Sequence, residues 1–137
     1  MNTMAAAAPN PIIPLAARIL LGAIFLVAGI RKVLAFAGTV AYFTKLGFPA
    51  PEAMAVIAIV IELGGSTLLI VGWRTRWVAW LLALFVLIAA FAAHRFWEVD
   101  AAQMNNQLNH FLKNLSIIGG LLMVVAFGPG PASADKS

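Results

Sequence analysis

The sequence predicts an all-α integral membrane protein: a four-helix bundle with an interfacial or re-entrant half-helix between its first and second spans. Of its 137 residues, 63% are hydrophobic and only 10% are charged, whereas about 25% of the residues in soluble domains are charged. The apolar residues fall into four stretches, and each can supply the roughly 20 residues that a helix needs to cross a bilayer. We therefore expect one membrane domain, residues 12–127, with flexible tails at 1–11 and 128–137.

The first span is predicted at residues 12–34. Three prolines lie ahead of it or in its first turn, where the missing proline N–H costs little. Arg31 and Lys32 mark its far end. No basic residue precedes the apolar region, as one would in a secretory signal. The first eleven residues are therefore interpreted as a tail that leads into the span.

The segment 35–52 is too short and too interrupted to cross the bilayer. Glycines and prolines break it, and it carries four aromatic residues and a lysine: Phe36, Tyr42, Phe43, Phe48 and Lys45. Aromatic rings and basic side chains gather at the membrane–water interface. The composition therefore predicts a helix that lies at the interface, or inserts halfway, against the mouth of the bundle.

The remaining spans are predicted at 51–73, 77–97 and 107–127. A tight basic turn, WRTR at 73–76, joins the second span to the third, and the most polar loop of the chain, 98–109, joins the third to the fourth. Four spans place both termini on one side of the membrane. Because the exposed basic turn shares that side, the positive-inside rule favours cytoplasmic termini.

Helical spacing gives every predicted span one stripe in which polar or ionisable residues interrupt the apolar sequence. The stripes are Arg18, Gly22, Phe25, Gly29 and Lys32 in the first span; Glu62, Gly65, Ser66 and Leu69 in the second; Trp80, Leu84, Leu87, Phe91 and His94 in the third; and His110, Lys113, Asn114 and Ile117 in the fourth. Glu62 lies near the middle of its span, where a lone charge costs from about 3 to more than 10 kcal/mol. It therefore requires a cation inside the bundle or a proton, and Arg18 and Lys113 are expected to be within its reach.

If the stripes converge, they enclose a polar cavity inside the bundle. A quinone fits such a cavity, with Trp80 and Phe91 beside its ring and His94 or Lys113 on its carbonyl oxygens. The residues expected to form the site are Arg18, Lys32, Glu62, Trp80, Phe91, His94, His110, Lys113 and Asn114. Three other readings stay open: an ion-pair network that only fixes helix register, a haem held by the two histidines, and an interfacial tryptophan belt that includes Trp80.

The composition excludes several classes of function. The chain contains no cysteine, which rules out thiol–disulfide chemistry, iron–sulfur clusters and thiolate zinc sites within it. No other metal site is expected. The formal net charge of +4 is small and the basic residues are scattered, so no nucleic-acid surface is predicted. Any electron chemistry would belong to a bound cofactor or to a partner protein.

Four pieces of the sequence resemble the DoxX family of small four-helix membrane proteins. In chain order they are RILLGAIFLVAGIRKV, IELGGSTLLIVGWRTRWVAW, AAFAAHRFW and NHFLKNLSIIGGLL, and the resemblance covers residues 12–130. It implies a four-helix bundle in the bacterial cytoplasmic (inner) membrane. Family members include subunits of a thiosulfate:quinone oxidoreductase and partners in membrane complexes that handle thiol and oxidative stress. The positions that match the charged points of the family pattern are Arg18, Lys32, Glu62, His94 and Lys113.

The resemblance and the polar stripes together predict a quinone-interacting or docking subunit of a membrane oxidoreductase complex that is not catalytic on its own. The expected partner is a redox protein or a second copy of the chain. The first alternative is a non-enzymatic adaptor that holds a partner through the aromatic segment 35–48. The second is a small transporter, which would need oligomerisation because four helices form at best a narrow pore.

Overall fold

The computed structural model describes residues 10–136, and within them the chain forms five α-helices and no strand. The helices are α1 (Ile12–Leu34), α2 (Phe36–Lys45), α3 (Pro51–Val71), α4 (Thr75–Ala93) and α5 (Ala101–Phe127). All except α2 are long and apolar enough to cross a membrane. The predicted fold class, a four-span helical bundle with a short helix between the first two spans, is confirmed. The predicted N-terminal tail lies outside the described residues apart from Asn10 and Pro11.

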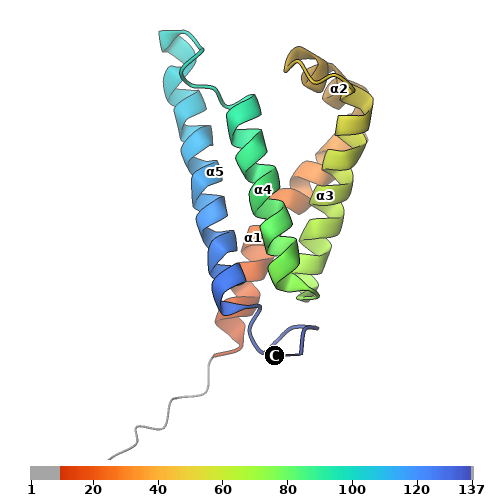
Figure 1. Cartoon of the computed structure of the whole chain (residues 1–137), viewed down its shortest axis with the longest axis vertical. Helices are drawn as coiled ribbons and strands as arrows, with labels where there is room; N and C mark the ends of the chain where they lie inside the picture. The colour runs from red at the N-terminus through yellow and green to blue at the C-terminus, as the bar shows by residue number, and fades with distance from the viewer. Residues whose placement is uncertain (1–9, 137) are drawn as a thin grey trace, which may run out of the picture.

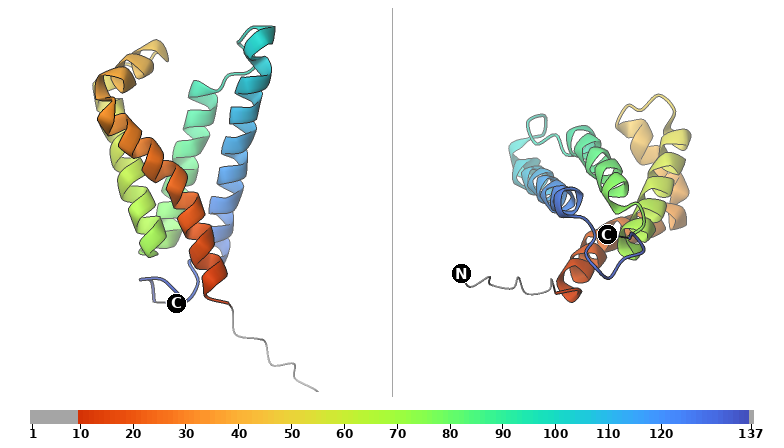
Figure 2. Two further views of the ribbon diagram at one scale, coloured as in Figure 1. Left: turned by 180° about the vertical axis from the view of Figure 1, so that it is seen from behind. Right: turned by 60° about the horizontal axis from the view of Figure 1, so that its bottom comes forward.

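The four long helices form two pairs, α1 with α3 and α4 with α5, which are joined mainly through α3 and α4. The pairs converge at the end that carries the C-terminal segment and splay apart at the end that carries α2, so the bundle has the outline of a V (Figure 1). α1 crosses the bundle diagonally, from the lower end of α5 to the upper end of α3 (Figure 2). This diagonal course decides which residues of α1 lie beside Glu62.

Glycines let α1 approach α3 closely. A Cβ added to Gly22 would lie 2.6 Å from Cγ1 of Ile70, and one added to Gly29 would lie 2.7 Å from Cδ2 of Leu63. Neither distance leaves room for a methyl group, so side chains of α3 pack directly on the backbone of α1 at these glycines. The buried residues of α1 are Arg18, Gly22, Phe25 and Gly29. The face that helical spacing predicts is therefore the face that packs.

The apolar core lies around α4. Its buried members are Phe25, Leu69, Val78, Ala79, Leu82, Ala83, Val86, Leu121 and Val124. The residues that α4 contributes are mostly small, so its neighbours pack close to its backbone. Gly65 of α3 serves the same contact, because a Cβ there would lie 2.8 Å from Cδ2 of Leu82.

The connection between α4 and α5 is shorter than predicted. α4 ends early, at Ala93, and α5 begins at Ala101, so most of the predicted loop at 98–109 is helical. Asp100 starts α5 as its N-cap by accepting a hydrogen bond from the N–H of Gln103 at 3.1 Å. The polar residues that suggest a loop in the sequence lie mostly exposed on the first turns of the helix instead.

The C-terminal segment, residues 128–136, is held against the bundle. The N–H of Ala134 donates to the carbonyl of Val71 at 3.1 Å, and the N–H of Asp135 donates to the carbonyl of Gly72 at 2.7 Å. The sequence predicts a flexible tail here, whereas in the structure this segment makes backbone hydrogen bonds with the end of α3. The residues of this segment are small or polar, so its backbone can lie directly against the end of α3. The same composition is typical of disordered tails, and it therefore does not predict this contact.

Candidate functional site

The carboxylate of Glu62 is paired with a cation from the neighbouring helix. Nζ of Lys32, in the last turn of α1, lies 2.8 Å from Oε1 of Glu62, near the middle of α3. Glu62 is 4% exposed, so the protein shields its carboxylate almost completely from lipid and water. The pair meets the need for a cation beside a mid-span carboxylate.

The expectation that Arg18 or Lys113 reaches Glu62 is wrong. Gly29 lies one turn before Lys32 on the same face of α1, and a Cβ added to it would lie 3.2 Å from Cβ of Glu62. α1 runs diagonally across the bundle (Figure 2), and its last turn, not its first, lies beside Glu62. A depth estimate from helix rise fails here because it assumes helices that run parallel to one another.

The second carboxylate oxygen of Glu62 has no hydrogen-bond partner. Oε2 is buried, and no donor among the described residues reaches it. Buried polar atoms without a partner are uncommon and cost free energy. An acceptor kept in this state is consistent with a site that receives a donor from elsewhere.

A cavity of about 340 Å³ lies beside this pair, and all five helices contribute to its wall. It lies between the two helix pairs, which splay apart toward the end that carries α2 (Figure 1). Most of the wall is apolar. Four of the predicted site residues line it: Lys32, Glu62, His94 and Asn114. Its volume falls at the lower end of the range for small-molecule sites, about 300–1,000 Å³.

The aromatic wall of the cavity differs from the predicted one. Trp80 and Phe91 are 53% and 52% exposed and lie on the outer face of α4. The inner face of that helix consists of Thr75, Val78, Ala79, Leu82, Ala83, Val86 and Ala90. The rings that line the cavity are those of Phe25, Tyr42, Phe43, Phe48 and Phe85. Ala79, Ala83 and Ala90, separated by four and seven residues, mark a helix contact, and this signal identifies the inner face of α4 from sequence.

His94 lines the cavity at the end of α4. Its Nδ1 lies 3.0 Å from Oε1 of Gln107. Because an amide oxygen only accepts hydrogen bonds, Nδ1 is the donor in this contact.

Two predicted site residues of α5, His110 and Lys113, are exposed and do not line the cavity. The ring of His110 stacks on that of His94, with centroids 5.0 Å apart and 21° between the planes. Stacked rings do not direct two nitrogens at one iron, as a haem held by both histidines requires. Within residues 10–136, no three His, Asp or Glu side chains are grouped as a metal site would need.

Arg18 lies at the opposite end of the bundle from Lys32. Its guanidinium donates to the carbonyls of Leu69 at 3.3 Å and Ile70 at 2.6 Å, and to that of Ala132. The last carbonyls of α3 have no partner within the helix and attract a cation through the helix dipole. Arg18, which is 1% exposed, therefore joins α1, α3 and the C-terminal segment and does not contribute to the cavity.

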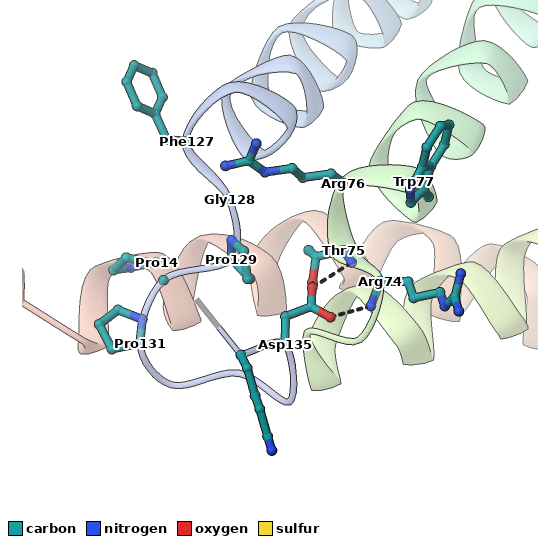
Figure 3. A pocket seen from close by; sticks show the side chains of 12 residues that line it. Pro14, Arg74, Thr75, Arg76, Trp77, Phe127, Gly128, Pro129, Pro131 and Asp135 are labelled. Atoms are coloured by element: carbon teal, nitrogen blue, oxygen red, sulfur yellow. Dashed lines mark hydrogen bonds between the residues drawn. The ribbon is translucent and has the colours of Figure 1, made fainter.

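A cleft of about 790 Å³ lies at this end, between the C-terminal segment and the start of α4 (Figure 3). The carboxylate of Asp135 accepts hydrogen bonds from the N–H of Arg74 at 2.6 Å, the N–H of Thr75 at 2.8 Å and the Thr75 hydroxyl at 2.6 Å. Burial opposes ionisation, but these hydrogen bonds and the nearby charge of Arg18 hold the pKa of Asp135 below its ordinary value. The carboxylate caps the N-terminus of α4, where a negative charge is favourable.

The chain is similar to known inner membrane proteins. The family model described as DoxX matches residues 13–95. Inner membrane protein YphA of Escherichia coli (strain K12) is 36% identical over 129 residues, which cover 94% of this chain and 92% of that protein. Inner membrane protein YqjF of the same bacterium is 38% identical over 122 residues, which cover 89% of this chain and 88% of that protein. The Surfeit locus protein 4 homolog of Schizosaccharomyces pombe is 28% identical over 101 residues, 69% of this chain and 33% of that protein. No solved structure matches the chain.

Proposed function

Because the chain belongs to the DoxX family and is, like its bacterial relatives, a multi-pass inner membrane protein, we propose that it binds a quinone beside Lys32 and Glu62 as a subunit of a membrane oxidoreductase complex. One observation carries the proposal. The carboxylate of Glu62 is buried mid-span, with one oxygen on Lys32 and the other without a partner, at a largely apolar cavity. Ionisable residues inside membrane spans usually mark functional sites.

The ion pair supplies both kinds of hydrogen-bonding group that a quinone needs. The ammonium of Lys32 has three N–H donors and directs one at Glu62. The others are available for a carbonyl oxygen of the oxidised quinone. Oε2 of Glu62 is available to accept a hydrogen bond from a hydroxyl of the reduced quinol. Asn114 adds an amide to the same wall.

The remainder of the cavity suits a flat ring. The rings of Phe43 and Phe48 meet edge to face, with centroids 5.5 Å apart, and both line the cavity together with Phe25 and Phe85. Aromatic side chains pack favourably against other planar π-systems. These residues take the role that the sequence assigns to Trp80 and Phe91. Because the wall comes from both helix pairs, the hydrocarbon tail of a quinone leaves between them toward the lipid.

In this proposal the electrons come from a partner protein. The chain has no cysteine, so no thiol of its own reduces the quinone. Conversion of a quinone to a quinol consumes two electrons and two protons. The partner delivers both electrons. One proton reaches the nearer ring oxygen through Glu62, and the second reaches the other ring oxygen from water. The chain is then the quinone-binding and docking subunit, and its partner oxidises the donor.

Quinone retention by purified protein tests the proposal. Wild-type protein extracted in a mild detergent is expected to carry quinone, measured by chromatography of the organic extract. Glu62→Gln preserves the size of the side chain but removes its charge, and a lost charge-assisted hydrogen bond lowers retention about tenfold. Glu52→Gln, at an exposed carboxylate in the first turn of the same helix, is the matched control and retains the wild-type amount. Wild-type protein that carries no quinone, and does not melt at a higher temperature when quinone is added, contradicts the proposal.

A non-enzymatic adaptor is the second candidate, and exposed rings on α2 favour it. Phe36 and Tyr42 are 39% and 45% exposed, which suits a docking surface, and of the two only Phe36 lies outside the cavity wall. Phe43 and Phe48 do not suit a docking surface, because they line the cavity. A pull-down of the partner separates the two candidates. An adaptor loses its partner in Phe36→Ala and keeps it in Glu62→Gln, whereas loss of the partner in Glu62→Gln alone indicates docking that depends on bound quinone.

A further inference from the structure

The cleft at the narrow end of the bundle carries a cation without a counter-ion. Its wall includes Arg74, Arg76 and Lys136, and Asp135 is the one acid among the described residues that line it (Figure 3). Both oxygens of Asp135 are already held by the start of α4. Within residues 10–136, both ion pairs of the protein lie elsewhere. The guanidinium of Arg76 is therefore left without an acidic partner in the described part of the chain.

The C-terminal segment turns beside this guanidinium. A Cβ added to Gly128 would lie 3.4 Å from Nη2 of Arg76 and 3.6 Å from its Nε. Gly128 has a φ of 81°, which favours glycine, so the segment can turn while its backbone stays close to the guanidinium. Figure 3 shows Arg76 extending from the start of α4 toward Gly128. The segment and the arginine side chain thus form one side of the cleft together.

The cleft lies where two spans end. α4 starts at Thr75 and α5 ends at Phe127. Trp77 and Phe127 line the cleft, and each is 76% exposed. Exposed aromatic residues at the ends of spans lie at the level of the lipid headgroups, and basic residues at that level attract anionic lipids. The arrangement combines donors for a phosphate with apolar surface for an acyl chain.

We propose that this cleft binds the phosphodiester of an anionic phospholipid, with Arg76 as the main contact. A guanidinium donates two parallel hydrogen bonds to phosphate oxygens, and Arg74 and Lys136 add positive charge. The acyl chains lie over Trp77 and Phe127. The N-terminus of α4 takes no part, because Asp135 occupies it. The site is separate from the cavity beside Glu62 and does not depend on quinone binding.

Lipid analysis of the full-length protein tests this assignment. Wild-type protein extracted from mixed vesicles of phosphatidylglycerol and phosphatidylcholine is expected to retain phosphatidylglycerol, measured by native mass spectrometry. Arg76→Gln is expected to retain about tenfold less, since it loses the charge-assisted pair of hydrogen bonds. Arg31→Gln, at an exposed arginine at the end of α1, is the matched control and keeps the wild-type amount. Equal retention by wild type and Arg76→Gln, or an equal loss in Arg31→Gln, overturns the assignment.

Two further measurements keep the test decisive. If Arg76→Gln does not purify as folded protein, Arg76→Lys keeps the charge but loses the bidentate fork. A loss of about threefold then supports the assignment, and unchanged retention overturns it. Thermal unfolding of delipidated wild type separates the lipid from free phosphate. Phosphatidylglycerol is expected to raise the melting temperature, and an equal rise with inorganic phosphate overturns the lipid assignment.

Discussion

Lys32 and Glu62 show how a carboxylate is accommodated inside a membrane helix. Glu62 is 4% exposed and depends on one cation, Nζ of Lys32 at 2.8 Å. Lys32 belongs to the last turn of α1, so its backbone lies near the end of its own helix while its ammonium reaches Glu62 near the middle of α3. The pair balances the charge of Glu62 but does not satisfy all of its hydrogen-bond acceptors, because Oε2 remains without a partner. At the scale of single residues, Glu62 can remain charged in this position because Lys32 pairs with it.

Removing one member of the pair is predicted to destabilise the protein more than removing both. Lys32→Met leaves the carboxylate unpaired, which costs about 3–5 kcal/mol for a buried pair. The double variant Lys32→Met/Glu62→Gln leaves no charge and recovers most of that loss. Thermal unfolding in detergent, followed by circular dichroism, measures both. The exposed pair of Arg95 and Glu98 provides the control, since breaking it changes stability by less than about 1 kcal/mol. A single variant as stable as the double one would show that the pair does not neutralise Glu62.

The sequence identifies Glu62 as the critical residue but not its partner. Its position in an apolar run is sufficient to predict a buried charge and the need for a cation. The choice among Arg18, Lys32 and Lys113 depends on how α1 tilts across α3, and periodicity within one helix carries no information on tilt. Arg18 instead holds carbonyl groups at the other end of the bundle. Side-chain pairing between helices therefore requires the packed structure.

At the scale of helices, glycine determines how close α1 and α3 come. Gly29 packs against Leu63 and Glu62, so this contact also positions the functional carboxylate. Gly64, next to Leu63 on α3, has open space around the position of its missing Cβ. Gly29 is therefore needed for close packing of α1 on α3, whereas Gly64 is not needed for any helix contact.

Substituting these glycines by alanine is predicted to give effects of opposite sign. Gly29→Ala forces side chains of α3 to shift and is expected to cost about 1–3 kcal/mol, as overpacking does. Gly64→Ala meets nothing, and its higher helix propensity is expected to leave stability unchanged or to raise it by up to about 1 kcal/mol. Melting temperatures of the two variants in the same detergent measure the difference. A Gly29→Ala variant as stable as Gly64→Ala would mean that α1 and α3 are farther apart than described.

The cap of α4 by Asp135 predicts a pH dependence. Because the folded pKa of this carboxyl is lowered, its contribution is complete above the ordinary aspartate value of about 4 and is lost as the pH falls through the lower folded value. Both oxygens of Asp135 accept hydrogen bonds, and Asp135→Asn replaces one of them by an NH2 group that can only donate. The substitution is therefore expected to lower the melting temperature near neutral pH, at a cost of about 1 kcal/mol. The difference from wild type should shrink as the pH falls below about 4. Asp100→Asn is the control, since asparagine is itself a good N-cap. A difference that is constant with pH contradicts the assignment.

At the scale of the whole molecule, the two helix pairs and the cavity between them are the basis of the proposed function. Length and hydropathy predict the four spans, and four of the predicted span boundaries, Ile12, Leu34, Pro51 and Phe127, coincide with helix ends. The V-shaped divergence is not predictable from these signals, because it depends on which helices pair. The same is true of the cavity wall: spacing on α4 predicts Trp80 and Phe91, whereas the packed structure supplies Phe43 and Phe85.

Covalent labelling with a photoreactive quinone analogue shows whether a quinone binds in the cavity beside Lys32 and Glu62, because the label marks where the ring lies. Protein in native-like membranes is illuminated with the analogue, digested and sequenced by mass spectrometry, with and without excess unmodified quinone. Labels are expected on the cavity wall, around Phe43, Phe85 and His94, and they are expected to disappear under competition and in Glu62→Gln. Labels confined to the outer face of α4 around Trp80, or a pattern that excess quinone does not change, would contradict quinone binding in this cavity.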